Sequence, residues 1–322
     1  MVVALAGGVG AARMLTGLIQ VAPPERIMAI VNTGDDVTLH GLHISPDLDT
    51  VTYTLAGVVN PETGWGLARE TWATMDALAS YGSGQLAWFR LGDKDLATHL
   101  YRTSRLRDGA TLSQVTAEIA ERWQVGVRIV PMSDDPVETR VTVTEAEGDS
   151  VEIGFQEYFV GRHHDVTVEK IRLAGIEDSL PSPGVVDAIA SADVVVICPS
   201  NPLVSIAPVL SVPGIEDAIA ARRSDVVAVS PIIAGRAIKG PADRLLTELG
   251  HEASAVGVAR LYARIAGTLV IDETDAGLAS AVEAEGLHCV VAPTIMHGLA
   301  EAAALARVVL GAPGLATREA AR

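Results

Sequence analysis

The sequence predicts an α/β fold: a Rossmann-like, doubly wound and mainly parallel sheet, interrupted by an inserted helical and antiparallel section. The chain of 322 residues starts with a short apolar run, a glycine turn and a helix pattern. Short apolar runs and helix-like segments alternate again through its second half. Ala, Val, Ile and Leu dominate the 49% hydrophobic fraction, which suits parallel strands buried between helices.

The first unit is a strand, a helix and a second strand. Val2–Ala6 and Ile27–Val31 are the apolar strands, and residues 11–21 between them have apolar side chains at helical spacing. A helical crossover brings the chain back to start a parallel neighbour, so this unit predicts the opening of a parallel sheet.

The middle of the chain departs from this alternation. Helices are predicted at residues 47–55, 67–79, 96–105 and 112–123, and a strand at 127–130. Residues 140–144 and 151–155 alternate as strands on either side of Gly148-Asp149, a hairpin signal, and residues 166–171 extend this antiparallel region. We expect residues 61–170 to form an inserted smaller α+β section.

The parallel pattern returns after this section. Strands are predicted at residues 194–198, 226–229, 269–271 and 289–291, and helices at 185–189, 215–221, 242–249, 276–284 and 299–310. We therefore expect residues 1–60 and 171–322 to form a Rossmann-like nucleotide-binding core. The polar residues 316–322 are predicted to be frayed.

The net charge of −16 excludes nucleic acid and anionic membranes as expected partners, because such a surface repels both. The N-terminal residues lack a basic segment and continue into the glycine turn, so they form a strand rather than a signal peptide. No apolar run approaches the ~18 residues of a membrane span. We expect a cytoplasmic protein that acts on small molecules, and a homodimer.

The glycine turn Gly7-Gly8-Val9-Gly10 joins the first strand to the first helix. This geometry points free helix N–H groups at a phosphate, and glycines leave room for the anion to approach. The turn is an incomplete dinucleotide fingerprint, because Arg13 stands where the third glycine belongs. The alternative is a tight strand–helix turn without a ligand.

Two acidic segments follow. Asp35 and Asp36 lie in the segment that follows the second strand, at the end of the sheet where open α/β folds bind ligands. Two adjacent carboxylates there suit a ribose or Mg²⁺. An Asx-turn or helix cap is the alternative. In Ser45-Pro46-Asp47-Leu48-Asp49, Ser45 or Asp47 serves as a helix cap, whereas Asp49 is less easily explained in this way.

Three polar turns of the second half each follow a predicted strand. They contain Ser200 and Asn201, Ser230, and Lys239-Gly240-Pro241. Asn and Ser offer the directional hydrogen bonds that a base or ribose needs, and ordinary loops are the alternative. In the inserted section, Arg90 opens a segment of mixed charge before a helix that contains His99.

As a set, these segments resemble one family. They are Gly7-Gly8-Val9-Gly10-Ala11-Ala12-Arg13, Asn-Thr-Gly-Asp-Asp at 32–36, His-Gly at 40–41, Ser-Pro-Asp-Leu-Asp-Thr at 45–50, Gly-Trp-Gly at 64–66, Leu-Gly-Asp-Lys-Asp-Leu-Ala-Thr-His at 91–99, Pro-Ser-Asn-Pro at 199–202 and Ser-Pro-Ile-Ile at 230–233. The chain resembles the 2-phospho-L-lactate transferases, the CofD/FbiA family of deazaflavin coenzyme biosynthesis. The match extends to at least Asp243.

The resemblance implies a Mg²⁺-dependent transfer. A phospho-2-lactate or phosphoenolpyruvate group passes from a guanosine-diphosphate-linked donor to the ribityl hydroxyl of Fo (7,8-didemethyl-8-hydroxy-5-deazariboflavin), and GMP leaves. Trp65, Trp72 and the segment 156–159 are more similar to the enolpyruvyl-using branch.

The resemblance also implies roles for single residues. The Fo contacts fall on Asp49 and Arg90, and Asp49 is the candidate catalytic group. The donor residues, which hold its diphosphate or line its nucleoside end, are Gly7, Gly8, Gly10, Asn32, Ser200, Asn201 and Ser230. From the chemistry of carboxylates, Asp35 and Asp36 are the candidate Mg²⁺ ligands. The inserted section contributes to the acceptor site.

Two other functions are open. A related family of regulatory proteins binds a nucleotide sugar without turnover, and Asp49 favours the transferase over that alternative. An NAD(P)-dependent oxidoreductase is the other alternative, and the missing third glycine is against it.

Overall fold

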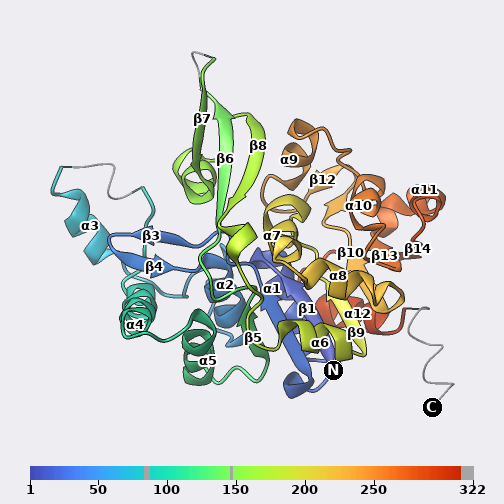
Figure 1. Cartoon of the computed structure of the whole chain (residues 1–322), viewed down its shortest axis with the longest axis horizontal. Helices are drawn as coiled ribbons and strands as arrows, with labels where there is room; N and C mark the ends of the chain where they lie inside the picture. The colour runs from blue at the N-terminus through green and yellow to red at the C-terminus, as the bar shows by residue number, and fades with distance from the viewer. Residues whose placement is uncertain (83–87, 146–147, 313–322) are drawn as a thin grey trace.

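A seven-stranded parallel sheet forms the centre of the molecule, and the predicted fold class is confirmed (Figure 1). The structure is a computed structural model that describes residues 1–82, 88–145 and 148–312; the predicted frayed segment 316–322 lies outside these residues. The strands are β1 (Val2–Ala6), β2 (Ile27–Val31), β5 (Arg128–Pro131), β9 (Val194–Ile197), β10 (Val226–Val229), β13 (Thr268–Ile271) and β14 (His288–Val291).

The strand order is β14-β13-β10-β9-β1-β2-β5. From β1 the chain winds outward to β2 and β5, and then returns to the other side of β1 to add β9, β10, β13 and β14. The connections that leave β1 and β9 therefore diverge, which makes this pair the topological switch point of the sheet. In open α/β sheets, ligands bind in the crevice outside the carboxyl ends of such strands.

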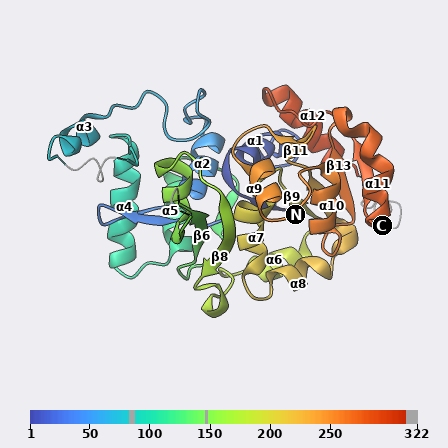
Figure 2. The same ribbon diagram turned by 90° about the horizontal axis from the view of Figure 1, so that it is seen from above.

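Successive residues of β1 face opposite layers, which explains why the whole strand is apolar. Val3 and Leu5 pack with one core cluster, and Val2, Ala4 and Ala6 with the other. The first layer contains α6 (Val185–Ser191), α7 (Ala207–Ser211), α8 (Ile215–Ala220), α9 (Ala242–Glu248), α10 (Ala255–Tyr262) and α11 (Ala279–Ala284). The second contains α1 (Gly8–Leu18), α2 (Pro46–Leu55), α5 (Leu112–Arg122) and α12 (Leu299–Leu310). Figure 2 shows α1 and α12 on the side opposite α6 and α8.

The middle of the chain adds three smaller units. They are the hairpin β3–β4 (Val37–Leu39, Leu42–Ile44), the helices α3 (Ala73–Ala79) and α4 (Asp95–Arg107), and an antiparallel sheet of β7 (Ser150–Gly154), β6 (Glu138–Thr144) and β8 (Val168–Ala174). The last unit projects from the main sheet in Figure 1. β5 lies within the predicted insertion yet pairs with β2, so part of that section belongs to the main sheet.

The prediction of one helix over 67–79 is wrong in its first half, since only α3 is helical there. Arg69 takes a left-handed φ of 56°, and Leu67 forms a β-bridge with Val59. The Glu70 carboxylate accepts hydrogen bonds from the backbone N–H groups of Lys94 (3.0 Å) and Asp95 (2.8 Å). These contacts cap α4 and outweigh the local helix preference of residues 67–72.

Other boundaries shift, and some elements were not predicted. α1 starts at Gly8, three residues earlier than expected, and ends at Leu18. The helix predicted at 276–284 is a 3₁₀ helix over Glu273–Leu278 followed by α11. The hairpin β3–β4, the short hairpin β11–β12 (Ile232–Ile233, Arg236–Ala237), α7 and α10 were missed. In the described part of the chain, no helix is long and apolar enough to cross a membrane.

The packing of α1 on α12 gives a testable prediction. An alanine Cβ at Gly17 would overlap the carbonyl oxygen of Ala302 at the start of α12. Gly17→Ala should lower the free energy of unfolding by about 1–3 kcal/mol or more, the usual cost of overpacking, in a urea titration. Gly277→Ala is the control, since nothing lies within 4 Å of its added Cβ. Equal stability of the two variants would contradict this packing.

Candidate functional site

A cavity of about 800 Å³ opens at the carboxyl ends of β1, β9 and β10 and extends beneath the middle section of the chain. Most of the predicted site residues line it, although they come from segments far apart in sequence: Gly7, Gly8, Gly10, Asp35, Asp49, Arg90, Ser200, Asn201 and Ser230. Asn32 and Asp36 lie outside this lining. The cavity therefore occupies the switch-point crevice.

The glycine turn forms the floor of the cavity, and its glycines are required by the protein's own packing. Gly8 has φ +68°, a left-handed conformation. A Cβ at Gly7 would lie 2.6 Å from the Ser205 Cβ, and one at Gly10 would overlap the Pro199 carbonyl oxygen. This packing alone requires glycines here, and that they also leave room for an anion stays a prediction. The first N–H groups of α1 still lack intrahelical partners and favour an anion.

Three predicted donor residues hold the loops that surround this turn. The Ser200 hydroxyl donates to the Gly7 carbonyl (2.8 Å), and the Asn201 side-chain carbonyl accepts from the Leu203 N–H (2.9 Å). The Ser230 hydroxyl donates to the Ile232 carbonyl (2.9 Å) and accepts from the Ile232 N–H (3.2 Å). These bonds fix the shape of the cavity wall between β9 and β10.

Asn32 lies beneath the wall rather than in it. Its side-chain NH₂ donates to Asp47 (2.9 Å) and to the Val204 carbonyl (3.3 Å), and its side-chain carbonyl accepts from the Gly34 N–H (2.9 Å). Asn32 thereby orients Asp47, which sequence reasoning treated only as a helix cap.

Asp35 and Asp47 form a pair of buried acids beside the glycine turn. Burial raises the pKa of Asp35 well above its usual value, and the charges of Asp47 and Asp36 raise it further. Burial also raises the pKa of Asp47 to about 6, although hydrogen bonds from Asn32 and the Gly8 N–H oppose this shift. Asp35 Oδ1 has no hydrogen-bond partner among the described residues. A cation would stabilise both carboxylates in their charged form.

Asp36 points toward a neighbouring cavity of about 220 Å³. Its Oδ2 lies 2.9 Å from His43 Nε2 and accepts a hydrogen bond from the Ser45 hydroxyl (2.6 Å). Burial raises the pKa of Asp36, with His43 and Ser45 opposing the shift. Its Oδ1 has no partner in the described part of the chain.

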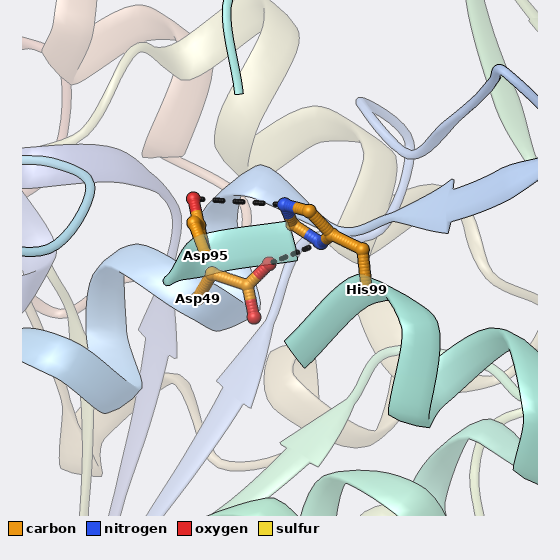
Figure 3. Close-up of side chains that lie close together, drawn as sticks. All are labelled: Asp49, Asp95 and His99. Carbon is orange, nitrogen blue, oxygen red and sulfur yellow. Dashed lines mark ion pairs between the residues drawn. The ribbon is translucent and has the colours of Figure 1, made fainter. Parts of the chain in front are cut away.

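Asp49 faces a polar network supplied by α4 (Figure 3). Asp95, His99 and Arg102 are spaced so that they share one face of this helix. Arg102 donates to both Asp49 oxygens, with Nη1 at 3.1 Å from Oδ2. His99 lies between the two acids, with Nδ1 at 3.7 Å from Asp49 Oδ2 and Nε2 at 3.5 Å from Asp95 Oδ2.

The network is largely buried, and its charged groups shift one another's pKa values. Burial lowers the pKa of Arg102, but Asp49 more than restores it. Burial raises the pKa of Asp95, but hydrogen bonds from His99 and Tyr53 lower it overall, and the Tyr53 hydroxyl lies 2.6 Å from Asp95 Oδ1. The sequence analysis assigned Asp95 and Arg102 no role beside Asp49, although their spacing to His99 along a helix was a usable signal.

The network contains a group of metal-binding residue types. One ligand atom each of Asp49, Asp95 and His99 lie within 4.8 Å of one another. However, Arg102 already donates to both oxygens of Asp49. A histidine ligand also suits transition metals better than Mg²⁺, which prefers oxygen. The network therefore fits a role in holding Asp49 better than a Mg²⁺ site.

Aromatic side chains form much of the cavity wall. The chain is only 4% aromatic, yet three of its four Trp and all three Phe line this cavity: Trp65, Trp72, Trp88, Phe89, Phe155 and Phe159. The Arg90 guanidinium lies 5.3 Å from the centre of the Trp72 ring and donates to Asp76 (2.6 Å). Such a wall suits a flat conjugated ring system.

Comparison with known proteins gives an independent result. Residues 2–297 match the family described as 2-phospho-L-lactate transferase CofD. A phosphoenolpyruvate transferase of Streptomyces griseus subsp. griseus is 49% identical over 312 residues, 96% of this chain and 97% of that protein. Those of Kitasatospora aureofaciens (48%; 96% of each chain) and Mycolicibacterium smegmatis (40%; 97% and 98%) are also similar.

A solved structure supports the fold. A member of the UPF0052 family from Bacillus halodurans aligns with a TM-score of 0.64 and 18% identity, and the alignment covers 96% of this chain and 99% of that one.

The buried acids give a pH prediction for the metal-free protein. A carboxyl whose pKa rises from 3.8 to about 6 on folding destabilises the fold progressively as pH rises through this range. Asp47→Asn removes that penalty. We therefore compare the free energy of unfolding of Asp47→Asn with that of the unmutated protein in urea titrations with EDTA. The difference, variant minus unmutated protein, should be more positive at pH 7.5 than at pH 5 by on the order of 1 kcal/mol.

The control for this experiment is Asp187→Asn, an exposed acid on α6. It should show no such change with pH. The raised pKa would be contradicted if Asp47→Asn changed the free energy of unfolding by the same amount at the two pH values.

Proposed function

Because the chain belongs to the 2-phospho-L-lactate transferase CofD family, among the phosphoenolpyruvate and phospholactate transferases of coenzyme F420 biosynthesis, we propose that it transfers phosphoenolpyruvate to Fo. In this proposal the donor is linked to guanosine diphosphate, the acceptor is the terminal ribityl hydroxyl of Fo, and GMP is released. The similar relatives named phosphoenolpyruvate transferase support an enolpyruvyl donor over a lactyl one.

One observation supports this function best: a single cavity is lined both by the glycine turn, with Arg13 and Lys239, and by six aromatic side chains. The glycine turn suits a diphosphate, and the aromatic side chains suit a planar deazaflavin. Two substrates bound together in this cavity would bring an acceptor hydroxyl close to a donor phosphorus. Such positioning accounts for much of the rate gain in phosphoryl transfer.

The donor lies, in this proposal, along the switch point. The N–H groups at the start of α1 bind the diphosphate, and the loops that contain Ser200, Asn201 and Ser230 surround the nucleoside. Asn32 contributes indirectly, because it holds Asp47 and the segment at Val204 in place.

Fo lies against Trp72, Trp88 and Phe89, with Arg90 held by Asp76 and Trp72 in a position to donate to it. These residues belong to the section 61–170, which supports the proposal that this section supplies the acceptor site while residues 1–60 and 171–322 bind the nucleotide. The homodimer and the cytoplasmic location stay predictions.

Asp49 orients the ribityl hydroxyl and accepts its proton. Arg102 bonds each carboxylate oxygen once, which fixes the plane of the carboxylate and leaves lone pairs on both oxygens. In a loose transition state the proton leaves late, as the new P–O bond forms. An acceptor held in a fixed orientation therefore matters more here than a strong base.

Mg²⁺ is the cation that we propose for this site. Asp35 and Asp47 are the residues that would hold it, because both offer carboxylate oxygens and both lie beside the glycine turn. When both are charged, their repulsion destabilises the pair, and a cation would offset it. When bound, the ion would offset charge on the phosphoryl oxygens. That Asp36 is a ligand stays a prediction, since its Oδ1 is also unpartnered among the described residues.

The direct test is to incubate the protein with Fo, Mg²⁺ and each guanylyl donor, and to follow GMP and the phosphodiester product by mass spectrometry. We expect product with the enolpyruvyl donor, and a rate lower by on the order of 100-fold or more for Asp49→Asn. Asp187→Asn should behave like the unmutated protein. No product with either donor would favour a nucleotide-sugar-binding regulatory protein.

The metal ligands are tested in the same assay. EDTA should stop the reaction and added Mg²⁺ should restore it, and Asp35→Asn should raise the Mg²⁺ concentration that gives half the maximal rate. Asp95→Asn should leave this concentration unchanged. The reverse pattern would assign the ion to Asp49, Asp95 and His99.

A further inference from the structure

Two cations of the cavity lack a carboxylate partner in the part of the chain that the structure describes. Among the described residues, the Lys and Arg side chains that line it are Arg13, Arg90 and Lys239. Arg90 pairs with Asp76, whereas Arg13 and Lys239 donate only to backbone carbonyls. Arg13 Nη1 lies 3.2 Å from the Met296 oxygen and Lys239 Nζ 2.9 Å from the Thr63 oxygen.

The lack of a carboxylate partner is of interest here because both cations line the cavity, in a chain that carries 40 Asp and Glu against 24 Lys and Arg. Within residues 1–82, 88–145 and 148–312, neither Arg13 nor Lys239 has a carboxylate within 4.0 Å. Burial lowers the pKa of Lys239, and the charge of Arg13 lowers it further, so the two cations repel each other. An anion between them would remove this repulsion.

Both cations adjoin the start of α1. Arg13 lies one helical turn after Val9, and a Cβ at Gly64 would touch both Val9 Cγ1 (2.9 Å) and Lys239 Nζ (3.4 Å). The ammonium group, the guanidinium and the positive end of the helix dipole thus lie at the same end of the cavity. Asp49 and the other aromatic side chains belong to other segments of the lining, whereas Trp65 follows the segment that contacts Lys239.

We propose that Arg13 and Lys239 bind the phosphate of the leaving nucleotide and stabilise the charge that develops on it, an assignment that rests on the proposed function. The ribityl oxygen forms a bond to the phosphorus that carries the enolpyruvyl group. The bond from this phosphorus to the bridging oxygen breaks, its electron pair stays on the GMP phosphate, and the hydroxyl proton passes to Asp49.

The leaving phosphate matches this pair better than the carboxylate of the donor does. Its charge grows toward a dianion as the bridging bond breaks, whereas the carboxylate keeps a single charge throughout. Two cations that are unpaired before the reaction suit a group whose charge increases during it. The neutral carbonyls of Met296 and Thr63 are weak partners, which an anion displaces readily.

The test compares GMP, GDP and guanosine by isothermal titration calorimetry without Fo. Arg13→Gln and Lys239→Gln should each weaken GMP and GDP binding about tenfold or more, or about 1.4 kcal/mol, and leave guanosine binding unchanged. Arg13→Lys should restore part of the affinity for GMP. Lys170→Gln, an exposed cation of β8, is the matched control, and thermal melting confirms that each variant folds.

Three results for Arg13→Gln and Lys239→Gln would overturn the assignment. They are an unchanged affinity for GMP, an equal loss of affinity for guanosine, or a loss of affinity that is seen only for phosphoenolpyruvate added as a competing ligand. The last would assign the cations to the organic acid. The outcome is separable from that of the proposed function. If the unmutated protein transfers the group to Fo but the variants bind GMP normally, the proposed function stands and the role of Arg13 and Lys239 is refuted. If the variants bind GMP weakly but the unmutated protein transfers nothing to Fo, the two cations bind phosphate and the proposed function is refuted.

Discussion

The close approach of the glycine turn to the segment after β9 is the constraint on which the site depends. Gly7 packs against Ser205 and Gly10 against the Pro199 carbonyl, with no room for a side chain at either position. This contact joins the carboxyl ends of β1 and β9 at the point where the sheet changes direction. The crevice that results has a backbone floor, so its anion-binding groups are fixed by the fold.

The charges around this floor are divided into three sets. Asp49 is fully paired with Arg102, and this pairing holds it in one orientation. Asp35 and Asp47 are buried next to each other, and Asp35 Oδ1 has no hydrogen-bond partner among the described residues. Arg13 and Lys239 lack carboxylate partners in the same part of the chain. Buried or unpaired charge destabilises a fold, and such groups are commonly retained where they bind ligands. We therefore expect the acid pair to bind a cation and the pair of Arg13 and Lys239 to bind an anion in the same cavity.

Much of this was predictable from sequence, because it depends on local pattern. Alternating apolar runs predicted the parallel sheet, and polar residues after strands predicted part of the cavity lining. The failures were tertiary. Glu70 caps the start of α4, 25 residues further along the chain, and the segment 67–72 that contains it is not helical. Asn32, predicted as a donor contact, is buried and donates to Asp47, a contact that the sequence did not predict. The aromatic wall collects residues from several distant segments, which no local pattern reveals.

The central claim is that one cavity holds both substrates at once, with the nucleotide at the glycine turn and the deazaflavin at the aromatic wall. It is tested most directly by titrating Fo into the protein with and without saturating GDP. We expect Fo to bind in both cases, and Trp72→Ala to weaken it strongly whereas Tyr81→Ala, an exposed aromatic outside the cavity lining, does not. Displacement of Fo by GDP would contradict the claim.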